Sequence, residues 1–442
     1  MLKILNENAA GLDVGSEKLH VSIAGGSPRV FDTMTGSMYE LRDWLKSLGV
    51  QTVAMEATGV YWLCVYEILE VAGLEPVVVN GKHVQNLPGR KTDMSDCQWL
   101  ATLHAHGLLR GGFVPKADIR QLQDYMRLRA DHITMAATHV QHMQKAMDRM
   151  NLKVHEVLSS LTGASGIAII EAILRGEREP QRLLVLADKS VLKHKRERLL
   201  AALAAHWKEE HLFSLRQAYE LWQVYQGKIG ECDQRIQALL EEQTSRRPPP
   251  QTPENPALEA KPKSLGRNAP QIDNLHYMLR QLCGGEDPTR IPGLTDYSLL
   301  TLISETGTDL KRWSSAKAFT AWLGLAPGSH QSGKRRAKVS RQRNRAGRLF
   351  CTLARSLARS VDKALGGFYR RLRARRGGLI ANQALARKLA ELYWRCLTRG
   401  LEYVETGLAA YEQSLRLQQQ RALSKLASKL GFELTPRPEV HG

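Results

Sequence analysis

A run of basic side chains between residues 327 and 348 constrains the fold of this 442-residue chain more than any other feature. The segment reads PGSHQSGKRRAKVSRQRNRAGR and contains no aspartate or glutamate. Burying unpaired charges costs too much free energy, so the segment must face solvent or a polyanion. We interpret it as a nucleic-acid-binding surface, because a basic cluster without carboxylates attracts phosphates. Its cations are Lys334, Arg335, Arg336, Lys338, Arg341, Arg343, Arg345 and Arg348.

The composition of the whole chain also indicates a polyanionic partner. Lys and Arg number 63 against 44 Asp and Glu, a formal net charge of +19, which favours nucleic acid or an anionic membrane surface. No apolar run reaches the roughly 18 residues that span a bilayer, and Asn6, Glu7 and Asn8 interrupt any signal-peptide core. Six scattered cysteines without a CxxC pair predict reduced thiols in a cytoplasm. Nucleic acid is therefore expected, and a membrane is not.

The first 80 residues alternate β-type runs with amphipathic helical ones. Helical spacing after Ser37 and Glu40, which form a predicted capping box, and again after Gly59 indicates two helices. Three strands joined by tight turns, followed by two strands that each come after a helix, predict a mixed sheet with flanking helices. The five predicted strands are 11–14, 18–24, 28–34, 51–57 and 76–80.

The rest of the chain is predicted to be mainly helical, with helices at 93–106 and 118–157 and a wholly helical stretch at 181–243. Near-heptad spacing in the last of these predicts a coiled-coil arm or, nearly as well, amphipathic packing against its own domain. A proline-rich linker follows. Beyond it, two helices joined by Ile291-Pro-Gly have the pattern of a helix–hairpin–helix phosphate site, or of two packed helices with an ordinary turn.

Four carboxylates stand where a predicted strand ends or a helix begins. Asp13 lies in the first strand and Glu56 near the end of the fourth, while Asp93 and Asp96 share one helix face. In a ribonuclease-H-like sheet the first strand and a later one are adjacent, and the following helix crosses their ends. Carboxylates gathered in this way repel one another unless cations neutralise them. We therefore predict a two-metal site for phosphodiester chemistry, with Mg²⁺ as the expected ion.

Each acid also has a structural explanation, as a strand-end turn former or as a favourable charge in the first turn of a helix. A phosphate loop of the actin and sugar-kinase type is a rival for Asp13, but it needs a second glycine-rich loop, which we do not find. The helical spacing of Phe319 and Trp322 favours core packing over base stacking. Four histidines without a Cys or carboxylate at zinc spacing are expected to be exposed or capping rather than metal ligands: His104, His106, His139 and His142.

Several motifs follow one another in order along the chain: Asp13, Glu56-Ala-Thr-Gly-x-Tyr, Lys91-Thr-Asp93-x-x-Asp96, Ile291-Pro-Gly, and Leu323-Gly-Leu-x-Pro327-x-x-x-x-Ser332-Gly. In this order they resemble the DEDD transposases of bacterial insertion sequences, the serine-assisted recombinases guided by a bridge RNA. The resemblance covers roughly 8–160 and 275–400.

The resemblance implies a resolvase-like ribonuclease-H domain, a helical coiled-coil middle and a mainly α transposase domain. We accordingly expect an α/β catalytic domain at 8–163, a helical region at 164–243, a linker at 244–270 and a helical domain at 271–430.

The resemblance also assigns roles to residues. Asp13, Glu56, Asp93 and Asp96 would hold Mg²⁺, and Ser332 rather than its neighbour Ser329 would be the nucleophile that forms a phosphoserine ester. Family members form coiled-coil dimers that pair into a tetramer on donor and target DNA, with a noncoding RNA that base-pairs to both. A cytoplasmic, nucleoid-associated enzyme is expected.

Two other functions stay open. A Holliday-junction resolvase or related nuclease would need the four acids but would use water in place of Ser332. A noncatalytic nucleic-acid-binding protein would have lost part of the acidic site, yet all four acids and the serine are present here.

Overall fold

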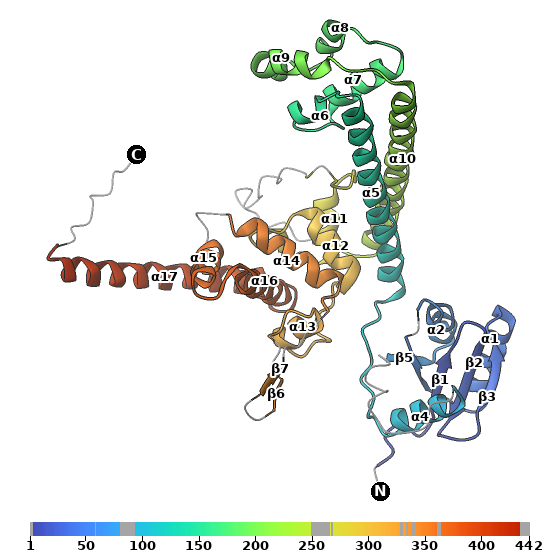
Figure 1. Cartoon of the computed structure of the whole chain (residues 1–442). Helices are drawn as coiled ribbons and strands as arrows, with labels where there is room; N and C mark the ends of the chain where they lie inside the picture. Colours follow the sequence, from blue (N-terminus) through green and yellow to red (C-terminus); the bar gives the residue numbers. More distant parts are fainter. Residues whose placement is uncertain are drawn as a thin grey trace. The chain divides into compact units, whose positions relative to one another are not determined.

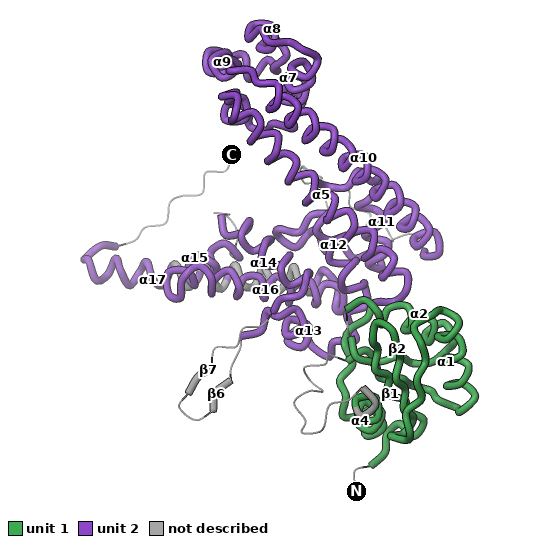
Figure 2. The backbone as a smooth tube through the Cα atoms, turned by 45° about the vertical axis from the view of Figure 1, so that its right-hand side comes forward, with its two compact units in different colours: residues 1–114 green, residues 115–442 purple. Residues whose placement is uncertain are grey.

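The chain folds into two compact units, residues 1–114 and residues 115–442 (Figure 2). The domain boundaries expected after residues 163, 243 and 270 stay predictions. The structure is a computed structural model, and it describes residues 3–57, 59–79, 93–248, 266, 268–327, 330–332, 335–337, 342–359 and 364–433.

The first unit contains a five-stranded mixed sheet of order β3-β2-β1-β4-β5, drawn in blue in Figure 1. β1 pairs antiparallel with β2, and β2 with β3, whereas β1–β4 and β4–β5 are parallel. The predicted mixed sheet is thereby confirmed, and its order is compatible with a ribonuclease-H-like fold. The strands are β1 (Ala9–Val14), β2 (Lys18–Ile23), β3 (Arg29–Asp32), β4 (Thr52–Glu56) and β5 (Glu75–Val79).

The two faces of this sheet have different neighbours, because alternate residues of a strand point to opposite sides. Leu12 and Val14 of β1 belong to a buried apolar cluster formed with α1 (Thr35–Ser47) and α2 (Trp62–Val71). The intervening residues of β1 face the opposite side, where α4 (Asp93–Ala105) packs against β1, β2 and β4.

The predicted capping box at Ser37 and Glu40 is wrong. α1 begins two residues before Ser37, and its N-cap, Met34, makes no side-chain cap hydrogen bond. Asp32 at the end of β3 accepts a hydrogen bond from the Met34 N–H at 2.8 Å. The strand end therefore holds the start of this helix.

The second unit contains two long helices that lie side by side, α5 (Ala117–Arg149) and α10 (Glu209–Ser245), as Figures 1 and 2 both show. α10 thus packs against its own chain, which is one of the two alternatives that its heptad spacing left open. A coiled coil between two chains stays a prediction.

The two long helices predicted from the sequence are shorter in the structure. α5 ends at Arg149 and is followed by Asn151 with φ +53° and by the short α6 (Val154–Val157). The stretch expected to be helical from 181 to 243 contains two breaks, after Leu184 and after Leu203. These breaks let α7 (Ala164–Leu174), α8 (Pro180–Leu184) and α9 (Lys189–Leu203) enclose an apolar cluster with the ends of α5 and α10.

The C-terminal part of the second unit is mainly helical, as predicted. Its aromatic core confirms the expectation for Phe319, whose ring centroid lies 5.0 Å from that of Trp313 and 6.3 Å from that of Tyr393. Within the described ranges, no helix is long and apolar enough to cross a membrane. The elements are α11 (Leu275–Leu282), η2 (Pro288–Arg290), α12 (Asp296–Thr306), α13 (Ala316–Trp322), β6 (His330–Ser332), β7 (Arg335–Ala337), α14 (Arg345–Leu357), α15 (Ala364–Arg376), α16 (Gly378–Arg399) and α17 (Leu401–Leu430).

A buried ion pair joins the long helices to the C-terminal helices. Arg129 of α5 is 1% exposed, and its Nε donates to Oδ1 of Asp233 on α10 at 2.5 Å. Its Nη1 donates to the Asn268 carbonyl oxygen at 3.0 Å, and its guanidinium lies over the ring of Tyr297 on α12. A guanidinium this deeply buried needs its carboxylate, because a lone charge there is poorly solvated.

We expect Asp233→Ala to lower the free energy of unfolding by about 3–5 kcal/mol, because it leaves the Arg129 charge buried and unpaired. The double variant Arg129→Met/Asp233→Leu should recover most of that loss. The matched control is Glu231→Ala, which breaks the exposed pair with Lys228 on α10 and should cost no more than about 1 kcal/mol. Urea unfolding measures all three, and equal losses for Asp233→Ala and Glu231→Ala would refute the assignment.

Candidate active site

Asp13 and Glu56 stand side by side at one edge of the sheet. Parallel pairing sets Leu12 of β1 opposite Met55 of β4, and the next residue of each strand is one of the two acids. Both acids are half-buried. Because the strands are parallel, both carboxylates lie toward their carboxyl ends, where open α/β sheets place their functional groups.

The two carboxylates also share the face of the sheet that α4 covers. A Cβ added at Gly11 would lie 2.2 Å from the Ala101 backbone nitrogen and 2.3 Å from the Cys97 carbonyl oxygen, both in α4. Gly11 pairs with Ala54 in the parallel ladder, and two residues further along each strand the side chains return to the same face. Those residues are Asp13 and Glu56. Glycine at position 11 lets the helix lie directly beside both acids.

α4 brings a third acid to this place. Asp96, near the start of α4, is half-buried, and the neighbouring Cys97 is fully buried. Burial, together with the negative charges of Asp13 and Asp96, raises the pKa of the Cys97 thiol to about 11. Asp13 of β1 and Asp96 of α4 are therefore both close enough to the Cys97 thiol to affect its pKa. Asp93 is the first residue of α4, and its side chain lies outside the described part of the structure.

The donor set suits hard divalent cations, which take carboxylate oxygens as ligands. Asp13, Glu56 and Asp96 do not, however, bring three ligand atoms within 4.8 Å of one another. The role of the acids as metal ligands stays a prediction.

Two further residues lie near the carboxyl ends of β1 and β4 and were not predicted to belong to the site. They are Cys97 and His20. His20 of β2 is half-buried and is the antiparallel partner of Asp13. Residues directly opposite each other in such a pair have their Cβ atoms about 4.5–5.5 Å apart on the same face. The tight turn at Gly15 could have predicted that His20 lies opposite Asp13, since a short hairpin sets the register of its strands.

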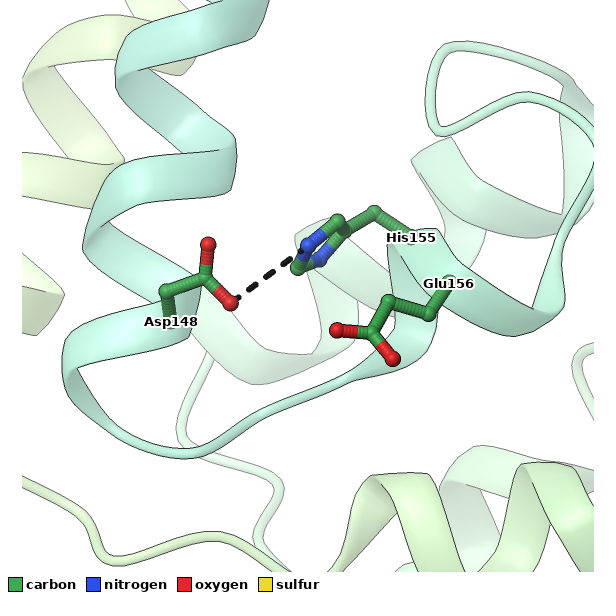
Figure 3. A group of neighbouring side chains, drawn as sticks. All are labelled: Asp148, His155 and Glu156. Atoms are coloured by element: carbon green, nitrogen blue, oxygen red, sulfur yellow. Dashed lines mark ion pairs between the residues drawn. The ribbon is translucent and has the colours of Figure 1, made fainter.

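The second unit contains another cluster of possible metal ligands, which Figure 3 shows: Asp148, His155 and Glu156. The His155 Nε2 atom lies 3.5 Å from Asp148 Oδ1. The Lys153 ammonium lies 2.5 Å from the same oxygen and 3.7 Å from Glu156 Oε1. Because this lysine already neutralises both carboxylates, we assign the group to a surface ion-pair network and not to a metal centre.

The four histidines have different surroundings. His104 is buried, and its Nε2 lies 2.8 Å from the Thr52 hydroxyl; burial lowers the pKa of its imidazole. The His139 ring stacks on Tyr225 and meets the His142 ring edge-on. Among described residues, neither they nor His106 join a group of three possible metal ligands.

Ser332 is the last residue of β6, which pairs antiparallel with β7 so that Ser332 is opposite Arg335. This two-stranded sheet was not predicted. The side chains of both strands, including Arg336, lie outside the described part of the structure. Ser332 belongs to the second unit and the acids to the first.

The basic run is described only at its end. Arg343, Arg345 and Arg348 are exposed, as their charge required. The Arg343 Nη2 donates to Gln383 Oε1 of α16 at 3.4 Å. Lys334, Lys338 and Arg341 lie outside the described residues.

The turn between η2 and α12 favours two packed helices over a helix–hairpin–helix phosphate site. Ile291 and Leu294 of the turn are buried, and Gly293 supplies a φ of +93°. Thr295 and Ser298 form a capping box in which each side chain accepts a hydrogen bond from the other residue's N–H. Two of the N–H groups that could bind phosphate at this helix end are therefore already satisfied.

Two family models match the chain, and they match the regions described above. A model for DEDD enzymes of the IS110 type, described as Transposase, matches residues 10–152. A second, described as Transposase IS116/IS110/IS902 family, matches residues 289–370. The chain belongs to the DEDD transposases of insertion sequences. No curated protein gives a significant match to it.

As a DEDD transposase, the protein is an enzyme that recombines DNA and depends on a divalent metal ion. The first match contains all four acids of the candidate site, and the second contains Ser332 and the whole basic run.

We expect Gly11→Ala to abolish metal-dependent DNA cleavage by this transposase, because the new methyl group forces the α4 backbone away from β1. Overpacking of this kind also costs about 1–3 kcal/mol of stability. Gly36→Ala is the matched control: its Cβ meets nothing within 4 Å, and alanine in α1 should be neutral or stabilising by up to about 1 kcal/mol. Cleavage rates and urea midpoints measure both effects. A Gly11→Ala enzyme with normal activity would contradict the close packing at this site.

Proposed function

We propose that this transposase cuts and rejoins donor and target DNA at a four-carboxylate Mg²⁺ site, with Ser332 as the nucleophile and a noncoding RNA as the guide. The observation that carries the proposal is the meeting of Asp13 and Glu56 on adjacent parallel strands, beneath the helix that carries Asp96. Family membership supports the DNA substrate.

The acids would hold the metal, and the surrounding residues would keep it in place. Asp13, Glu56, Asp93 and Asp96 are the proposed ligands, and Mg²⁺ is preferred because every donor is an oxygen. When bound, the ions supply polarisation of the scissile phosphate and neutralise charge on the leaving oxygen. Cys97, next to Asp96 in the chain, is fully buried, and burial is the main cause that raises the pKa of its thiol.

Ser332 would convert cleavage into transesterification. Its Oγ forms a bond to phosphorus while the bond from phosphorus to the leaving nucleotide oxygen breaks. A serine hydroxyl is a weak nucleophile and must lose its proton to a base, for which His330, two residues earlier in β6, is our candidate. The phosphoserine ester retains the energy of the phosphodiester, so a DNA hydroxyl can later displace Ser332 without ATP.

The basic run would hold the nucleic-acid backbone behind the serine. Arg343, Arg345 and Arg348 are exposed, and contacts of this kind give affinity and steep salt dependence but little sequence information. Selectivity would come from base pairing between a guide RNA and both DNAs, as in other RNA-guided enzymes.

Assembly is part of the proposal. The long helices α5 and α10 offer an arm for dimer formation, and two dimers would pair as a tetramer on the two DNAs. The acidic site of one subunit would then work with the Ser332 of another. In this assembly the enzyme would act at the nucleoid.

A resolvase-like nuclease is the second candidate, because the three described acids and Asp93 all belong to the first compact unit. Water could attack phosphate there without any residue of the second unit. The two candidates differ in one product, the covalent protein–DNA adduct.

We expect the full-length enzyme with Mg²⁺, copurified RNA and donor DNA to form a protein–DNA adduct that survives denaturing electrophoresis. Ser332→Ala should eliminate the adduct and strand joining, whereas the matched control Ser329→Ala should retain both. Cleavage by Ser332→Ala at the normal rate, without an adduct in any variant, would establish the nuclease in place of the recombinase. RNA sequencing of the purified protein completes the test: the guide proposal requires one predominant noncoding species.

A further inference from the structure

The end of α15 is a concentrated array of arginines. Five of the residues from 370 to 376 are Arg and none is Lys, and no Asp or Glu occurs between residues 364 and 390. All five are exposed. The next carboxylate, Glu391, pairs with Arg387 at 3.1 Å on α16. The arginines are Arg370, Arg371, Arg373, Arg375 and Arg376.

Two large aliphatic side chains follow this array directly and face solvent. Leu379 is 87% exposed and Ile380 is 54% exposed. From the next residue onward α16 turns apolar side chains into the core, and Ala381, Leu385 and Leu389 are fully buried. The exposed pair is therefore not the edge of a core stripe. Neighbouring apolar side chains that are exposed and rimmed by charged residues are a feature of interaction sites.

The chain turns back sharply at this point. A single residue, Gly377, separates α15 from α16, and the two helices pack against each other. Gly377 has φ +84°, a conformation that favours glycine over other residues. The turn at residues 377–380 thus presents the aliphatic pair at the end of the arginine-rich helix. We call residues 370–380 the α15–α16 corner.

We propose that the α15–α16 corner is a DNA wedge: Leu379 and Ile380 insert between base pairs of the duplex while the arginines bind the flanking phosphates. This inference rests on the proposed function, because it assumes that duplex DNA is what the enzyme handles. Proteins that distort DNA use aliphatic side chains in this way, and the few kcal/mol lost in unstacking are offset by new contacts to the bent duplex. Unstacking would open neighbouring base pairs to strand exchange.

The chemistry of the corner favours DNA over its two other possible partners. Arginine has a planar fork that matches phosphate oxygens and fits a narrowed minor groove, and the array contains arginine alone. An anionic membrane does not require that choice, since lysine attracts its surface equally well. A second copy of this chain would bring a net charge of the same sign to the corner.

The test uses full-length protein and duplexes that carry 2-aminopurine next to TA steps, which unstack easily. Wild-type protein should increase the 2-aminopurine fluorescence. Leu379→Ala/Ile380→Ala should lose this increase while its affinity changes by less than about tenfold, since the unstacking cost disappears together with the contact. Arg373→Ala/Arg375→Ala/Arg376→Ala should instead weaken binding and lower the slope of log K against log[salt] by about 2.7.

The matched control is Leu423→Ala/Leu426→Ala on α17, which removes two leucines that are each 54% exposed and should leave the fluorescence increase intact. Circular dichroism confirms that each variant is folded. Three results would overturn the wedge: an undiminished increase in Leu379→Ala/Ile380→Ala, binding to phosphatidylserine vesicles that this variant abolishes, or a loss of oligomeric state in it.

Unstacking needs no chemistry, so this assay separates the wedge from the proposed function. Asp13→Asn protein should unstack DNA normally. If wild-type protein unstacks DNA but forms no adduct, the proposed function fails and the wedge stands; if it forms the adduct without unstacking, the reverse holds.

Discussion

The acidic edge of the N-terminal sheet depends on the contact between Gly11 and the backbone of α4. A side chain at position 11 would overlap two backbone atoms of that helix. Without the contact, α4 would sit further from β1, and Asp96 would move away from Asp13 and Glu56. The contact thus gathers acids from two neighbouring strands and a helix, which is the arrangement that the proposed metal site requires.

The second unit must keep its many basic side chains exposed while its helices stay packed. The buried Arg129–Asp233 pair and the aromatic cluster around Phe319 hold the helices together from inside. Arginines of the α14 and α15 regions then lie outside the core, where phosphates can reach them. The four proposed acids therefore belong to the first unit, and the proposed nucleophile Ser332 and the exposed arginines belong to the second.

The sequence predicted those features that depend on local pattern. Period-two runs predicted all five strands of the sheet, and the position of Asp13 and Glu56 at strand ends predicted their common edge. The reversals after Arg149 and Leu203 could not be predicted, because helical periodicity continues on both sides of each break and only tertiary packing separates them. Strands of three residues, such as β6 and β7, are too short to show an alternation. The place of His20 near Asp13 depends on the register of β1 and β2, and the place of Cys97 depends on how α4 packs against β1. Neither place was predicted from the sequence.

Counting the metal ions tests the central claim most directly. Electron paramagnetic resonance of full-length protein titrated with Mn²⁺ should show two spin-coupled ions per chain in the wild type. Asp13→Asn and Asp96→Asn should each abolish the coupled signal, while Glu75→Gln, at the opposite end of the parallel strands, should leave it unchanged. A wild-type protein that binds no Mn²⁺, or a coupled signal that survives both aspartate substitutions, would contradict the account.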